Sequence, residues 1–140
     1  VFNNIFLRDN IITTDAIETG IIQDTASAEV TVATSNGTVN GATITIGSGF
    51  TELLIWQSGR ACIQLDDGVM TTSAGLVSAP VGITTADYRK TYTVDDRIAD
   101  VFIITSPPAG TYTFGYINSG GTRTSQLNPG ELNCIIMLIK

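Results

Sequence analysis

The side chains that could carry out chemistry in this chain are mainly carboxylates, because the sequence contains no histidine. Without histidine, a Ser-His-Asp triad, a Cys-His pair and a histidine-ligated metal site are all excluded. The carboxylates that lie close together in sequence are Asp66-Asp67 and the group Asp95, Asp96 and Asp100. A glycosidase needs two carboxyl groups about 5–9.5 Å apart across a cleft. Adjacent aspartates on a strand or turn point in different directions, so we expect no catalytic pair.

Turn chemistry accounts for these carboxylates. Asp66 and Asp67 precede Gly68, and aspartate favours turns because it bonds its own backbone and tolerates the left-handed conformation. The oxygens of residues 95–100 could bind Ca²⁺, but the Asp-x-Asp-x-Asp-Gly pattern is absent and Arg97 supplies a local counter-charge. We favour a solvated turn there. We expect no enzyme, no metal site and no cofactor.

The composition indicates an all-β protein. The 140 residues fit one domain, and Thr, Ile and Val together make up 48 of them. These β-branched side chains are stiff and pack well on a pleated surface. Short apolar runs separated by turn residues at spacings of about 8–12 predict an antiparallel β-sandwich or jelly roll over 1–140. Residues 1–24 are the least regular, and because the chain begins with Val we expect an upstream region before them.

The charge pattern and the short apolar runs argue against two kinds of partner. The net charge is −6, and the seven Lys and Arg residues are scattered rather than gathered in a stripe. Nucleic acid is therefore an unsuitable partner, because its phosphates must be neutralised by clustered basic groups. No apolar run approaches the roughly 20 residues of a membrane-spanning helix, so we expect no membrane insertion.

Alternation and turn signals place the strands. A hairpin at Asn36-Gly37 or Asn40-Gly41 should join strands at 29–33 and 42–46. Strands at 51–56, 60–65 and 69–72 should form a meander with turns at 57–59 and 66–68, and 73–87 should be a loop. Further strands are expected at 88–94, 98–105, 111–117, 123–127 and 131–140, with one helical turn at 15–20.

The two cysteines leave two interpretations open. Cys62 and Cys134 are 72 residues apart, with no neighbouring ligand for a zinc site. They could be buried thiols that behave as small hydrophobes, or one disulfide that links the middle of the domain to its last strand. We favour buried thiols, because a core of this size does not require a covalent link.

The last strand has apolar side chains on both faces. Ile135, Met137 and Ile139 alternate with a second apolar set made of Leu132, Cys134, Ile136 and Leu138. Large apolar side chains left in water forgo about 1.5–3 kcal/mol each, and such a patch normally marks an interface. The alternative is a central strand covered by 1–24. We favour a homotrimer whose interface includes Leu132, Ile135, Met137 and Ile139.

Aromatic and basic residues mark a candidate receptor site. Trp56 stands beside the expected turn 57–59, and Tyr88, Arg89 and Tyr92 follow the expected loop 72–87. Aromatic faces stack on sugars, and loops on a rigid scaffold often carry recognition. We predict a receptor-binding rim of these four residues. The alternative is that Trp56 fills the core or an interface and that the others lie on an ordinary strand.

Three segments near the end of the chain carry a resemblance. They are Asp100-Val101-Phe102-Ile103-Ile104-Thr105, then Pro107-Pro108-Ala109-Gly110-Thr111-Tyr112-Thr113-Phe114, then Leu127-Asn128-Pro129-Gly130-Glu131-Leu132. This pattern resembles the C-terminal receptor-binding domains of bacteriophage tail fibres and, more loosely, the trimeric jelly rolls of the C1q/TNF-like class. The resemblance implies a trimeric sandwich on a virion surface or in another extracellular setting. The resemblance predicts no strand order for this chain, and it assigns no functional residue to it.

These observations lead to one expected function and two alternatives. We expect a non-catalytic receptor-binding domain of a viral tail fibre or spike that recognises a host-surface glycan or protein. One alternative is a virion decoration, assembly or trimerisation protein without a receptor. The other is a bacterial surface adhesin or pilus subunit, in which Cys62 and Cys134 should be bonded.

Overall fold

The computed structural model describes residues 22–32, 37–61, 71–93, 96–119 and 130–140. Strands make up about three quarters of this part of the chain, and its only helix is a single 3-10 turn. The all-β class predicted from the composition is therefore confirmed. The elements are β1 (Ile22–Val32), β2 (Gly37–Ile46), β3 (Glu52–Arg60), β4 (Thr71–Ser78), η1 (Thr85–Tyr88), β5 (Arg89–Thr93), β6 (Arg97–Thr105), β7 (Gly110–Ser119) and β8 (Gly130–Ile139).

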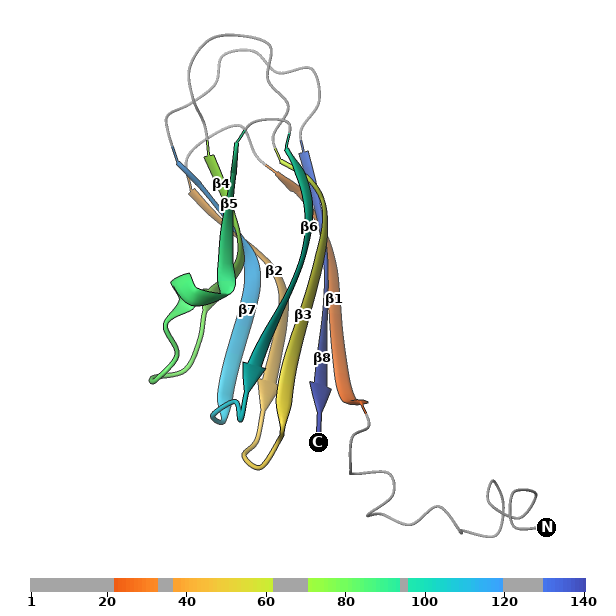
Figure 1. Ribbon diagram of the computed structural model, residues 1–140, viewed down its shortest axis with the longest axis vertical. Coiled ribbons are helices and arrows are strands. Elements are labelled where there is room, and N and C mark those ends of the chain that lie inside the picture. Colours follow the sequence, from red (N-terminus) through yellow and green to blue (C-terminus); the bar gives the residue numbers. More distant parts are fainter. Residues whose placement is uncertain (1–21, 33–36, 62–70, 94–95, 120–129) are drawn as a thin grey trace, which may run out of the picture.

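The strands form two antiparallel sheets that face each other (Figure 1). Sheet A has the order β1-β8-β3-β6, and sheet B has the order β2-β7-β4-β5. The pairing is nested: β1 pairs with β8, β2 with β7, β3 with β6 and β4 with β5. This nested order, wrapped over two sheets, is the connectivity of a jelly roll. The predicted antiparallel sandwich is thus confirmed.

The core lies between the sheets because side chains alternate from one face of a strand to the other. On β7 the inward positions hold Tyr112, Phe114 and Tyr116, and all three are fully buried. The Tyr112 hydroxyl donates to the Pro108 carbonyl oxygen at 2.7 Å. Burial raises the pKa of Tyr112, so the hydroxyl keeps its proton and remains a donor. The facing side chains of sheet A include Leu53, Ile55, Ile104, Leu132 and Ile136.

The predicted hairpin between 29–33 and 42–46 is wrong. β1 pairs with β8 and β2 pairs with β7, so these consecutive strands lie in different sheets. Asn40-Gly41 lies inside β2, where the register shifts opposite β7, and thus belongs to a β-bulge. The other candidate turn begins at Asn36, which lies outside the described residues. Local turn chemistry was outweighed by the long-range pairing that buries both strands.

The predicted turn at 57–59 is also wrong, because β3 continues through it to Arg60. Gln57 is fully buried, and its Nε2 donates to the Ala74 carbonyl oxygen at 3.2 Å. Gly59 has φ +139°, and a Cβ placed there would collide with the Glu131 carbonyl oxygen of the neighbouring strand. The glycine therefore allows close approach of two backbones rather than a reversal of the chain.

We predict that Gly59→Ala destabilises the fold by about 1–3 kcal/mol, because alanine must hold a backbone conformation that only glycine adopts freely. Urea denaturation should show a lower midpoint at an unchanged slope. Gly47→Ala is the matched control, since its Cβ would meet only one Phe50 ring carbon, at 4.0 Å. A Gly59→Ala midpoint equal to that of the parent would contradict this account.

Several strand boundaries also change. Much of the expected loop 73–87 is regular structure, because β4 runs to Ser78, between β7 and β5, and η1 begins at Thr85. β1 begins at Ile22, inside the segment 1–24 that was expected to be irregular. The strands predicted at 98–105 and 111–117 are confirmed within β6 and β7. The predicted helical turn at 15–20, the turn at 66–68 and the strand at 123–127 lie outside the described residues, as do 62–65 and 69–70 of the strands predicted at 60–65 and 69–72. The predicted meander over 51–72 is wrong, because β3 and β4 belong to different sheets.

Candidate functional site

The outer face of sheet A is apolar. Ladder pairing aligns Ile135 of β8, Trp56 of β3 and Val101 of β6 in one row across the sheet. These side chains are 46%, 55% and 52% exposed, whereas large apolar side chains normally lie inside a protein. The adjacent row contains Met137, Leu54 and Ile103. We use "apolar face" for Leu54, Trp56, Val101, Ile103, Ile135, Met137 and Ile139.

A hollow lies within the apolar face. Trp56, Ser58, Asn133 and Ile135 line it, and its volume is about 320 Å³. The four residues come from β3 and β8, where register places Trp56 opposite Ile135 and Ser58 opposite Asn133. An indole and an aliphatic side chain form one wall, and an amide and a hydroxyl form the other. We call this hollow the Trp56 pocket.

The outer face of sheet B is of the opposite character. Hydroxyl groups on neighbouring strands hydrogen-bond one another in pairs along this face. The pairs are Thr43–Thr113 at 3.2 Å, Thr45–Thr111 at 2.9 Å, Thr71–Ser119 at 2.9 Å and Ser73–Thr91 at 2.8 Å. Such a surface is compatible with water, so only sheet A presents an extended apolar surface among the described residues.

The residues predicted for the oligomer interface divide between the two faces of β8. Ile135, Met137 and Ile139 lie on the outer face, as their alternation predicted. Leu132 points the other way and is 1% exposed, so it belongs to the core and not to the apolar face. β8 is a central strand, between β1 and β3, and its outer side remains accessible in the described part of the chain.

Sequence reasoning missed three members of the apolar face, Leu54, Val101 and Ile103. Their strands have apolar residues at successive positions, and a run of this kind is typical of a strand that is buried on both faces. The same signal in β8 was interpreted as an interface. Three neighbouring strands with the same two-faced pattern were therefore the available clue to one continuous surface.

The predicted receptor-binding rim is not formed. Trp56 lies on the outer face of sheet A, whereas Tyr88, Arg89 and Tyr92 belong to η1 and β5 at an edge of sheet B. Tyr92 is 4% exposed and packs in the core, because its position alternates with the outward-facing Thr91 and Thr93. Tyr88 is partly buried against the core and Arg89 is partly exposed, so only these two stay near a surface of sheet B.

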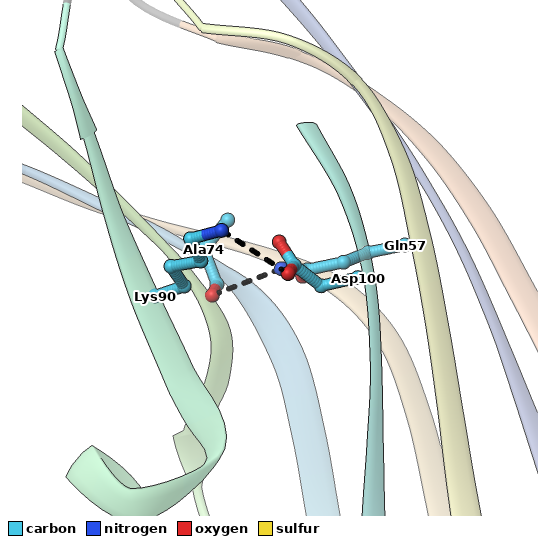
Figure 2. Close-up of polar contacts among 4 residues, drawn as sticks. All are labelled: Gln57, Ala74, Lys90 and Asp100. Atoms are coloured by element: carbon cyan, nitrogen blue, oxygen red, sulfur yellow. Dashed lines mark hydrogen bonds and ion pairs between the residues drawn. The ribbon is translucent and has the colours of Figure 1, made fainter. Parts of the chain in front are cut away.

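Polar contacts bridge the open edge between β5 and β6. The Lys90 Nζ lies 3.4 Å from the Asp100 Oδ1 and 5.4 Å from the centre of the Tyr92 ring. Figure 2 shows this ion pair beside the buried contact between Gln57 and the Ala74 carbonyl oxygen. The Lys90 side chain is 59% exposed, so solvent screens the pair and its contribution to stability is small. The inward-pointing carboxylate of Asp100 on this edge strand also discourages β6 from pairing with a strand of another molecule.

Asp96 closes the turn before β6, where its backbone N–H donates to the Thr93 carbonyl oxygen. Its Oδ2 accepts hydrogen bonds from the Thr93 backbone N–H and from the Thr93 hydroxyl, both at 2.8 Å. The bond from the Thr93 backbone N–H has the larger effect and the hydroxyl bond the smaller, and both hold the pKa of Asp96 below its usual value. The predicted solvated turn accounts for Asp96 but not for Asp100, which lies inside β6 and pairs with Lys90 rather than Arg97. Asp66, Asp67 and Asp95 lie outside the described residues. Within the described ranges, no three metal-ligating side chains are grouped.

We predict that Asp96→Asn lowers the Tm at neutral pH, because the charged acceptor is lost. The carboxylate has a lower pKa in the folded than in the unfolded chain, so its stabilisation is present above about pH 4. It disappears as the pH falls through the pKa of the folded state. Thermal melts of parent and variant between neutral and acidic pH should therefore converge. A Tm difference that does not change with pH would contradict this prediction.

Cys134 is a free, buried thiol on the inner face of β8. Burial raises its pKa, so the thiol stays neutral and behaves as a small apolar side chain. Cys62 lies outside the described residues.

Comparisons with protein-family models and with curated proteins find no match for this chain. In the described part of the chain, no helix has the length and apolar character needed to cross a bilayer.

Proposed function

We propose that this domain is a non-catalytic receptor-binding module of a viral tail fibre or spike, assembled as a homotrimer on the virion surface. It would recognise a glycan or a protein on the host surface. The observation that carries the proposal is the contrast between the two outer faces of the sandwich. One sheet presents an apolar face and the other presents paired hydroxyl groups.

That contrast favours burial of sheet A against other copies of the chain. The four most exposed members of the apolar face lie on three adjacent strands, so a partner could cover them together. Trp56, as an exposed tryptophan at the centre of such a patch, has the character of an interface anchor. This assigns Trp56 to assembly and removes it from the receptor-contact residues.

The receptor contact is better sought on the connection between β4 and β5, residues 79–88, which projects from the sandwich (Figure 1). Val81, in the turn of this connection, is 99% exposed. The connection ends at Tyr88, directly before the partly exposed Arg89. A projecting loop on a rigid sheet scaffold is a common location for recognition. An arginine there could bond a hydroxyl or a carboxylate of the receptor.

The decisive experiment combines assembly and binding. Sedimentation equilibrium of the 14.8 kDa chain should give a trimer at micromolar concentration, and a glycan array should identify bound sugars. Val81→Ser/Arg89→Ala should weaken binding to the array or to host cells at least about tenfold, or roughly 1.4 kcal/mol, with an unchanged Tm. Asn40→Ala/Thr45→Ala, at exposed positions of β2, is the control. Binding of the loop variant at the parent level would reject this contact.

A structural decoration or trimerisation protein is the second candidate, because the apolar face supports assembly without requiring a receptor. A stable trimer that binds neither sugars nor host cells would favour it. The adhesin or pilus interpretation required a bond between Cys62 and Cys134. The free thiol of Cys134 favours the other two candidates.

A further inference from the structure

We propose that the Trp56 pocket of each subunit is filled by Val101 of the next subunit, in a closed ring whose axis runs parallel to the strands. The inference rests on the homotrimer of the proposed function and specifies how its subunits meet. The occupant of the pocket is thus a second copy of this chain, with β6 as the element that it contributes.

The ladder register supplies the first argument. Val101, Trp56 and Ile135 share one row across sheet A. A closed rotational assembly moves a subunit around the axis without shifting it along the axis. If the axis is parallel to the strands, Val101 therefore arrives at the neighbouring subunit at the height of Trp56 and Ile135. Both residues line the pocket.

The position of β6 supplies the second argument. β6 is an edge strand of sheet A, whereas the pocket lies over the two central strands β3 and β8. Contacts in a three-membered ring are heterologous, so one part of a face must meet a different part of the next subunit. The edge strand β6 supplies the protruding part, because Val101 and Ile103 are each about half exposed. The Trp56 pocket supplies the hollow part of the next subunit.

Charge supplies the third argument. Arg97 precedes Val101 by four residues on β6, and Glu131 precedes Ile135 by four residues on β8. The register aligns Arg97, Arg60 and Glu131 in one row, so β6 and β8 run in the same direction. The displacement that brings Val101 to Trp56 and Ile135 of the next subunit therefore also brings Arg97 to the row of Arg60 and Glu131, where the Glu131 carboxylate offsets the like charge of Arg60. Opposite charges at the rim of an interface fix register and orientation.

Cysteine cross-linking tests this contact directly. Chains with Ile135→Cys and chains with Val101→Cys, one set lengthened by a tag, are mixed, allowed to exchange subunits and mildly oxidised. We expect mixed disulfide-linked dimers on a denaturing gel, because each Cys lies opposite the other across the interface. Each variant alone should give no dimer. The parent controls for native cysteines, and Thr45→Cys on sheet B mixed with Val101→Cys controls for random collision.

Trp56 provides a second measurement, because it is the single tryptophan of the chain. Its fluorescence should shift to the blue as concentration drives assembly, since the half-exposed indole becomes covered. Val101→Asp should abolish both this shift and the trimer, while Thr45→Asp should leave both unchanged. Circular dichroism of each variant verifies that the sandwich is folded.

The outcomes separate this inference from the proposed function. A trimer without mixed cross-links and without a tryptophan shift rejects the pocket contact but leaves the trimer. Strong dimers from Val101→Cys alone indicate a twofold contact and reject the ring. A monomer at all concentrations rejects the trimer together with the contact. Loss of receptor binding in an intact, cross-linkable trimer concerns the β4–β5 connection and leaves the contact in place.

Discussion

Ile135→Asp is expected to convert the proposed trimer into folded monomers at micromolar concentration. Ile135 is 46% exposed within a subunit, so aspartate is compatible with the isolated sandwich. In the assembly the same carboxylate would be removed from water beside Trp56 and Val101, and an unpaired buried charge costs several kcal/mol. Sedimentation equilibrium measures the change as a fall in mass from three chains to one.

Matched variants separate loss of assembly from loss of folding. Met137→Asp, one row away on the outer side of β8, should act in the same direction. Thr45→Asp introduces the same charge on the exposed outer face of sheet B and should leave the trimer intact. If Ile135→Asp remains trimeric, the apolar face is not the subunit interface. If it unfolds, the residue has a role within the subunit that its exposure does not suggest.

Tyr92→Ala is expected to destabilise the fold by about 3–5 kcal/mol, since it removes a large buried aromatic side chain. Tyr92 is 4% exposed and packs with Tyr116, Ile98 and Leu132 between the sheets. For a domain of this size, that loss corresponds to a Tm lower by about 10–20 °C. Thermal unfolding followed by circular dichroism provides the measurement.

Two controls distinguish packing from recognition at this site. Among the described residues, the Tyr92 hydroxyl has no hydrogen-bond partner, so Tyr92→Phe should leave stability unchanged or slightly increased. Arg89→Ala, at a partly exposed neighbouring position, should leave the Tm unchanged. A Tyr92→Ala variant that keeps the parent Tm but loses receptor binding would restore Tyr92 to the receptor site and overturn its assignment to the core.

Local sequence signals were reliable where the chain alternates or where its composition is decisive. The alternation that predicts a strand at 111–117 correctly located β7, whose inward positions hold Tyr112, Phe114 and Tyr116. Local sequence signals failed where one residue type serves two different structural purposes. Gly59 marks either a turn or a close approach of strands, and only the proximity of Glu131 decides between them. Asn40-Gly41 was likewise one of two candidate hairpin turns, although it lies in a bulge of β2.

The sequence by itself determined that this chain is an antiparallel β-sandwich with two apolar faces on its last strand. That information is local, because β-branched composition and period-two alternation depend only on neighbouring residues. Only the tertiary structure decided that β8 lies at the centre of sheet A, with Trp56, Val101 and Ile135 in one row. Strand order and register depend on contacts between residues far apart in sequence. Their energies come from burying whole faces together, so no single segment encodes them.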